Sequence, residues 1–162
     1  MKLDERTEIE YCKTEAESGW TILVSCNDVG TRCVDIGIPI SSALVGKIPL
    51  GSCFLNYQIR IDAVGSDRFC DEAAALMGET KDRRYWIHFD FGRYGFNRDV
   101  DAVRTYFGDK AAHLIGFIFP NRSDFSLATV SNSLELTMKL IPRLKEKELI
   151  LGSHRQRLAY ER

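Results

Sequence analysis

The chain has 162 residues, of which 44% are hydrophobic and 28% are charged, a composition that suits one globular domain with a single core. Its formal net charge of −1 gives no sign of a nucleic-acid binder, although a local basic face balanced by acid elsewhere stays open. No apolar run approaches the roughly 20 residues that span a bilayer, and the charged start MKLDERTEIEY has no signal-peptide core, so we expect a cytoplasmic protein without membrane contact.

The first third of the chain predicts two strands. The opening dozen residues are polar and predict a frayed end or a short helix. Residues 20–26 (WTILVSC) are rich in β-forming residues and precede a turn signal at Asn27. Residues 33–38 predict another strand that Pro39 closes, and residues 41–51 predict a turn-rich connection.

The middle of the chain predicts two further strands around a helix. Residues 53–62 (CFLNYQIRID) alternate, which predicts a half-buried strand whose polar face ends in Asp62. Asp67 is placed to cap a helix that runs to Met77, with Gly78 after its end. A second alternating strand follows in the stretch WIHFDFGRYGF, which begins at Trp86.

This second strand has two different faces, because alternate residues of a strand point to opposite sides. The row that predicts burial in the core is Ile87, Phe89 and Phe91. The row on the other face is Trp86, His88 and Asp90. The second row is either a solvated face or part of a site.

The remaining segments predict helix, strand, helix and strand in turn. Asn97 is placed to cap a short helix that Gly108 ends, and residues 113–119 (HLIGFIF), apolar on both faces, predict a central strand covered on both sides. A longer helix is expected over residues 125–147, and residues 148–151 (ELIL) predict a last strand. The apolar stripe predicted for this helix is Leu127, Val130, Leu134, Met138 and Ile141.

Two details concern the end of the chain and the cysteines. Pro142 should kink or shorten the last turn of the long helix, and the basic tail over residues 152–162 is helical or loose. The cysteines are odd in number, widely spaced and without a CxxC pair, which predicts buried reduced thiols rather than a disulfide framework or a zinc site. They are Cys12, Cys26, Cys33, Cys53 and Cys70.

This order of elements predicts an α/β fold, or mixed α+β, in which helices flank a three-layer mixed sheet with a parallel portion. We expect residues 1–162 to form one domain. Within it, residues 1–56 would supply N-terminal strands and turns, residues 57–151 a core, and residues 152–162 the basic tail.

The segment His88-Phe-Asp-Phe-Gly-Arg-Tyr-Gly-Phe96 resembles an active-site strand of type II restriction endonucleases of the PD-(D/E)xK superfamily. In the subgroup that recognises sites with a GATC centre, this strand reads approximately E-[IV]-Q-F-[GS]-[KN]-Y-[AP]-F. The matching positions are Phe91, Gly92, Tyr94 and Phe96. The resemblance extends over roughly residues 57–151 and implies a restriction-endonuclease-like core that acts on DNA.

The resemblance also implies a site. Asp62 falls where the family brings in its first metal-binding aspartate, so Asp62 and Asp90 would hold Mg²⁺ for phosphodiester hydrolysis. The family's catalytic glutamate is replaced here by His88, which is a poor magnesium ligand and a plausible general base. The candidate catalytic residues are Asp62, His88 and Asp90. The histidine also fits a degenerate site.

Simpler interpretations stay open for each of these residues. Asp62 would end a strand before a turn, His88 would be a half-exposed histidine of the sheet, and Asp90 would pair with a nearby arginine such as Arg60. Trp86 would serve packing rather than base stacking.

The sequence therefore leaves two hypotheses for the function. The first is a nucleic-acid-associated protein with magnesium-dependent nuclease activity, which at this length would work as a homodimer or with a partner. The second is a non-enzymatic cytosolic binding protein, such as an immunity protein that neutralises a toxin, whose partner is a protein.

Overall fold

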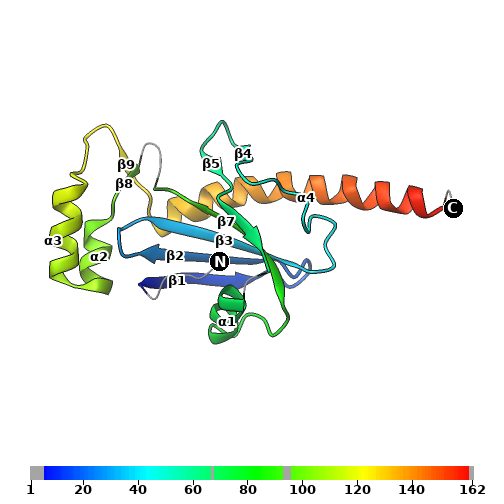
Figure 1. Ribbon diagram of the computed structural model, residues 1–162, viewed down its shortest axis with the longest axis horizontal. Helices are drawn as coiled ribbons and strands as arrows, with labels where there is room; N and C mark the ends of the chain where they lie inside the picture. Colours follow the sequence, from blue (N-terminus) through cyan, green and yellow to red (C-terminus); the bar gives the residue numbers. More distant parts are fainter. Residues whose placement is uncertain (1–5, 67, 93–95, 161–162) are drawn as a thin grey trace.

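The computed structural model describes residues 6–66, 68–92 and 96–160, and at its centre lies a five-stranded sheet (Figure 1). The order of the strands is β1-β2-β3-β7-β6, and every neighbouring pair in this sheet is antiparallel. The five strands are β1 (Thr7–Thr14), β2 (Thr21–Asn27), β3 (Arg32–Pro39), β6 (Ala63–Gly65) and β7 (Arg84–Asp90).

Two short strand pairs lie outside this sheet. The antiparallel pair consists of β4 (Cys53–Phe54) and β5 (Ile59–Arg60). The parallel pair consists of β8 (Phe96–Asn97) and β9 (Ser126–Leu127). The fold is therefore mixed α+β, as predicted, but the parallel portion expected within the central sheet is wrong.

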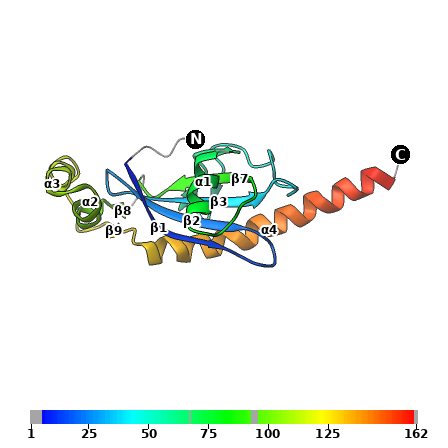
Figure 2. The same cartoon turned by 90° about the horizontal axis from the view of Figure 1, so that it is seen from below.

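Helices lie on both faces of the sheet and at one end of it. α1 (Arg68–Leu76) and α4 (Val130–Tyr160) cover opposite faces, as the turned view shows (Figure 2). α2 (Val100–Phe107) and α3 (Asp109–Ile118) form a hairpin at the end of the molecule opposite to the C-terminus (Figure 1). None of the helices within the described ranges combines the length and the apolar character that crossing a bilayer requires.

The main core lies between the sheet and the first half of α4. The row predicted to face the core, Ile87, Phe89 and Phe91, is buried there. α4 contributes Leu140, Ile141 and Leu144, which lie on one helix face. A smaller cluster on the other face of the sheet joins α1 to Leu23 and Trp86.

The face that α4 buries follows the predicted apolar stripe only in part, because Ile141 is buried and Leu134 packs against the core. Met138 is exposed, while Ser133 and Thr137 are fully buried. Their hydroxyls donate to the carbonyl oxygens of Thr129 and Ser133, at 2.8 and 2.7 Å, so they enter the core without an unpaired polar atom. Hydropathy alone does not predict that Ser133 and Thr137 lie in the core, because it does not account for hydroxyls that hydrogen-bond to the backbone of their own helix.

Three segments predicted as strands have other structures. Residues 113–119 lie almost entirely in α3, and residues 148–151 lie within α4, which Pro142 does not end. A short apolar run does not separate a buried strand from a helix by its pattern. Residues 53–62 do not form one strand, because Leu55, Asn56 and Tyr57 adopt left-handed backbone angles that reverse the chain between β4 and β5.

Of the other local predictions, some are confirmed and some are wrong. The opening dozen residues were expected to fray or to form a helix; from Thr7 onward they form the edge strand β1, and residues 1–5 lie outside the described residues. Asn97 lies in β8, and Asp99 caps α2 instead by accepting from the backbone N–H of Ala102 at 3.0 Å. Gly78 follows α1 in the left-handed conformation, as predicted, while the expected cap Asp67 lies outside the described residues.

A buried charge cluster attaches the α2–α3 hairpin to the sheet. The guanidinium of Arg32 makes two hydrogen bonds of 2.7 Å to the carboxylate of Glu10 and a further ion pair with Asp99 at the start of α2. The hydroxyl of Tyr106 in α2 donates to Glu10 at 2.9 Å. Such a cluster fixes geometry more than it adds net stability, since removing these charges from water is costly.

Candidate functional site

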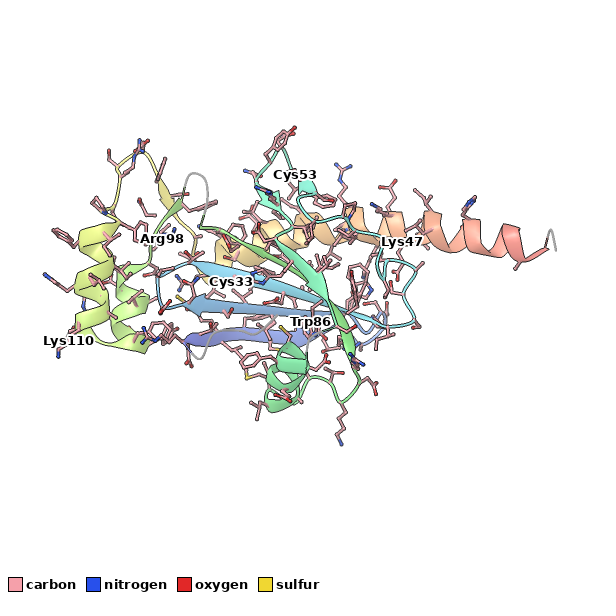
Figure 3. The ribbon with its side chains drawn as sticks, in the orientation of Figure 1. Cys33, Lys47, Cys53, Trp86, Arg98 and Lys110 are labelled. Carbon is pink, nitrogen blue, oxygen red and sulfur yellow. The ribbon has the colours of Figure 1, made fainter. Side chains whose placement is uncertain are left out.

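The polar row of β7 begins with Trp86, which packs inside the protein. Its ring lies directly across from Gly37 of β3, where a Cβ would come within 2.7 Å of the ring. Its indole N–H donates to the carboxylate of Asp71 in α1 at 3.0 Å, and the same oxygen accepts from the backbone N–H of Arg84 at 2.9 Å. Trp86 therefore anchors α1 to the sheet, and the packing interpretation holds (Figure 3).

His88 forms an ion pair with a residue that the sequence reasoning missed. Its Nδ1 lies 2.9 Å from Oδ1 of Asp35, which is directly opposite on β3 and fully buried. Among the described residues, no group hydrogen-bonds the second carboxylate oxygen of Asp35. A lone carboxylate inside the apolar strand Cys33–Ile38 was the signal available in the sequence, because a buried carboxylate needs a partner.

The electrostatics of this pair follow from burial and neighbouring charge. Burial, the largest influence, opposes the charged form of His88, but the hydrogen bond and the charge of Asp35 outweigh it. The charges of Asp90 and Asp62 act in the same direction, so the pKa of His88 is raised above its ordinary value. A raised pKa enlarges the share of the histidine that is protonated at a given pH, and the protonated form cannot accept a proton as a general base.

Asp62 and Asp90 line one pocket of about 320 Å³ next to this pair. The backbone N–H of Asp62 donates to the carbonyl oxygen of His88 at 2.9 Å, which joins the end of the β4–β5 segment to β7. Oδ1 of Asp90 accepts from the backbone N–H of Gly92 at 2.8 Å. The remaining lining residues are Gly51, Cys53, Tyr57, Gln58, Arg60, Phe91 and Phe96.

The structure thus brings the three predicted site residues to one region, with the two carboxylates at the pocket and the His88–Asp35 pair beside them. Of the three left-handed residues in the β4–β5 turn, Tyr57 lines this pocket, and each of the three costs roughly 1–2 kcal/mol of backbone energy. Within the described residues, however, no three His, Cys, Asp or Glu side chains form a group that could hold a metal ion. Mg²⁺ is commonly held by one or two protein carboxylates, with waters and substrate phosphates as its other oxygen ligands, so the two carboxylates at the pocket match the number that it commonly uses.

The cysteines offer no activated thiol in this region. All five are reduced thiols. Cys26, Cys33 and Cys70 are buried, as predicted, whereas Cys12 is half-buried and Cys53 is exposed. Burial raises the pKa of Cys26 to about 12 and also raises that of Cys33, so neither forms a thiolate near neutral pH. Cys53 lies exposed on β4 at the pocket (Figure 3).

A second candidate surface, which sequence reasoning also missed, lies on α3. Leu114, Phe117 and Ile118 are 55%, 82% and 51% exposed, while Ala112 and Ile115 on the other side pack against α2. Leu114 and Ile118 also line a groove of about 600 Å³. The signal was the run HLIGFIF, whose apolar residues on both faces predicted a segment covered on both sides.

The comparisons with known proteins add no relative to this picture. No protein-family profile, curated protein or solved structure matches this chain.

Proposed function

We propose that this chain is a non-enzymatic protein-binding module, of the kind that includes immunity proteins, and that it binds its partner through α3. The observation that carries the proposal is the contiguous apolar surface of Leu114, Phe117 and Ile118. Single exposed apolar residues are ordinary on protein surfaces, but a contiguous group beside a groove is typical of an interaction site. One side of this helix, with Ala112 and Ile115, already packs against α2, so a partner would cover the exposed side.

The contacts of the polar residues in the sheet also support a binding function. His88 is engaged by Asp35, Oδ1 of Asp90 receives the Gly92 N–H, and the backbone of Asp62 is bonded to β7. These contacts stabilise the sheet, so each of the three residues has a structural role that needs neither a metal nor a substrate.

The test is a quantitative affinity capture from an extract of the source cell, with the wild-type chain and Phe117→Ser as baits. We expect a protein that the wild type retains to be reduced at least tenfold with Phe117→Ser, because a central aromatic contact in an interface is worth 1–2 kcal/mol or more. Leu149→Ser is the matched control, since Leu149 is 72% exposed and belongs to the second half of α4, the part of that helix that lies far from α3 in Figure 1. Equal capture by all three baits would contradict the proposal.

A second candidate is magnesium-dependent cleavage of DNA. The specific observation in its favour is that Asp62 and Asp90 line the same pocket, with Arg60 placed to contact a phosphate. The elements after β7 no longer support it by fold, because residues 113–119 and 148–151 are helical. Incubation of DNA with the protein and Mg²⁺ tests it directly: cleavage by the wild type that is lost in both Asp62→Ala and Asp90→Ala would establish this candidate, and no cleavage would remove it.

A further inference from the structure

Another pocket lies between β8, the end of α3 and the segment that leads to β9, and its volume is about 310 Å³. Figure 3 shows Arg98, one of its lining residues, between the sheet and the α2–α3 hairpin. The lining includes three phenylalanines, Phe96, Phe119 and Phe125, and two arginines, Arg98 and Arg122. No carboxylate of the described residues lines it. This arginine pocket is therefore aromatic and cationic.

The charge of Arg98 forms no ion pair with a described residue. Its side chain is half-buried, its guanidinium carbon lies 4.9 Å from the centre of the Phe119 ring, and its Nη1 donates to the hydroxyl of Thr31. A Cβ at Gly92 would lie 2.7 Å from this Nη1 and 3.1 Å from Oδ1 of Asp90. That oxygen accepts the N–H of Gly92 at 2.8 Å and offsets the charge of Arg98 only from a distance. A guanidinium partly removed from water in this way favours an anion as its partner.

Arg122 has a different role, because its charge is already paired. Its Nε and Nη2 donate to the two carboxylate oxygens of Asp124 at 3.1 and 3.0 Å, and its guanidinium lies 4.4 Å from the centre of the Phe125 ring. The amide nitrogen of Asn97 donates to the carbonyl oxygens of Arg122 and Phe125 at 3.0 and 2.8 Å. These bonds join the segment before β9 to β8, so this wall of the pocket is formed before any ligand binds.

We infer that the arginine pocket binds a small organic anion that carries a flat ring, either an aromatic carboxylate or an aromatic phosphate ester. Arg98 would hold the anionic group, since a guanidinium matches the geometry of carboxylate and phosphate oxygens. The phenylalanines would contact the ring of the ligand, since aromatic rings attract one another edge-to-face or offset. The volume lies at the lower end of the range of roughly 300–1,000 Å³ for small-molecule sites, which limits the ligand to a small one.

This inference goes beyond the proposed function and does not depend on it. The pocket borders the proposed partner surface at Ile118, which lines both the pocket and the groove on α3. Phe117, the residue that tests partner binding, is 82% exposed and does not line the pocket. Binding of the small anion therefore needs no protein partner.

The experiment is a titration of the ¹⁵N-labelled chain, followed by the shifts of its backbone amides. The probes are phenyl phosphate, benzoate, inorganic phosphate and benzyl alcohol. We expect phenyl phosphate or benzoate to shift the amides of residues 96–98 and 118–125 in a saturable way, and the tighter of the two identifies the anionic group. Inorganic phosphate and benzyl alcohol should bind at least about tenfold more weakly, because each supplies only one of the two kinds of contact.

Three variants make the titration specific. Arg98→Gln should weaken binding of the aromatic anion at least about tenfold, because it removes the charge that holds the anionic group. Arg104→Gln is the matched control, since Arg104 is an exposed arginine of α2 that pairs with Asp101 and does not line the pocket. Phe117→Ser should also bind the anion as the wild type does, whatever it does to partner capture. An amide spectrum of Arg98→Gln that is unchanged outside the pocket shows that its fold is intact.

Several results would overturn the inference. Neither aromatic anion might be expected to bind without the pocket, so the absence of saturable shifts at its residues removes the site. Equal affinities for phenyl phosphate and inorganic phosphate would reduce it to a contact with any anion. Equal binding by the wild type and Arg98→Gln would mean that the guanidinium does not hold the ligand. Should Arg98→Gln fail to fold, Phe125→Leu replaces it, and unchanged binding of phenyl phosphate there contradicts the role of the aromatic wall.

Discussion

The ion pair of Asp35 and His88 couples the stability of the sheet to pH. The folded-state pKa of His88 is raised above the ordinary value of about 6.5. Its stabilising contribution is therefore fully present below the pKa of the unfolded chain and is lost as the pH rises through the folded-state pKa.

This direction of the pH dependence gives a prediction for the stability of Asp35→Ala. The substitution should lower the free energy of unfolding by about 1–3 kcal/mol, because it leaves a buried imidazole N–H without its acceptor. The loss should be larger at pH 5.5 than at pH 8.5, where less of the histidine is charged, and urea unfolding at both values measures it. An equal loss at both pH values would show that the pair is not charged in the folded protein.

The thiols differ in exposure, and this gives a second prediction at the same scale. Cys53 is exposed, whereas burial raises the pKa of the half-buried Cys12 to about 11. A dithiobisnitrobenzoate titration of the native protein should find one fast thiol, which Cys53→Ser removes, and denaturation should expose the rest. More than one fast thiol in the native chain would contradict the packing of α1 and β3.

At the scale of elements, α4 has two halves with different roles. Leu144 lies in the core, whereas Leu149, little more than one turn later, is exposed. The second half of the helix extends away from the sheet (Figure 1). Leu144→Ala should lower the free energy of unfolding by about 2–5 kcal/mol, since it leaves a cavity. Leu149→Ala should change it by less than about 0.5 kcal/mol. Equal effects in urea unfolding would mean that the second half of α4 is packed as well.

The elements that could be predicted are those whose pattern had a single interpretation. β2, β3 and β7 were predicted close to their observed bounds, because alternation of β-forming residues between turn signals specifies a strand. The run HLIGFIF and the segment ELIL were predicted as strands and form helices, since a short apolar run fits both. Length and the two alanines before HLIGFIF would have favoured a helix.

Only part of the candidate site could be predicted from the sequence. Asp62, His88 and Asp90 come from distant or alternating positions and do lie in one region. Asp35 was missed because its role depends on the register between β3 and β7, which no local pattern in the sequence specifies. The surface on α3 was not predictable in this way, because the run HLIGFIF predicts a covered strand and the structure has an exposed helix there.

At the scale of the whole molecule, the chain combines a rigid sheet with exposed apolar surfaces on its helices. The charged residues of the sheet, among them Arg32, Asp35 and His88, are paired inside the protein. Large exposed apolar residues lie on α3, at the end of α1 and on the second half of α4, and also outside the helices, as Leu50 and Tyr57 do. We therefore favour a function in protein binding over a reaction catalysed at the pocket.

Hydrogen exchange of the chain, alone and in the complex that it captures from the source cell, tests this account most directly. We predict slower exchange of the backbone amides over residues 109–118 in the complex, with residues 51–62 and 88–92 unchanged, because the partner covers α3 and not the pocket. Slower exchange at the pocket with α3 unchanged would contradict the account and would favour a ligand bound between Asp62 and Asp90.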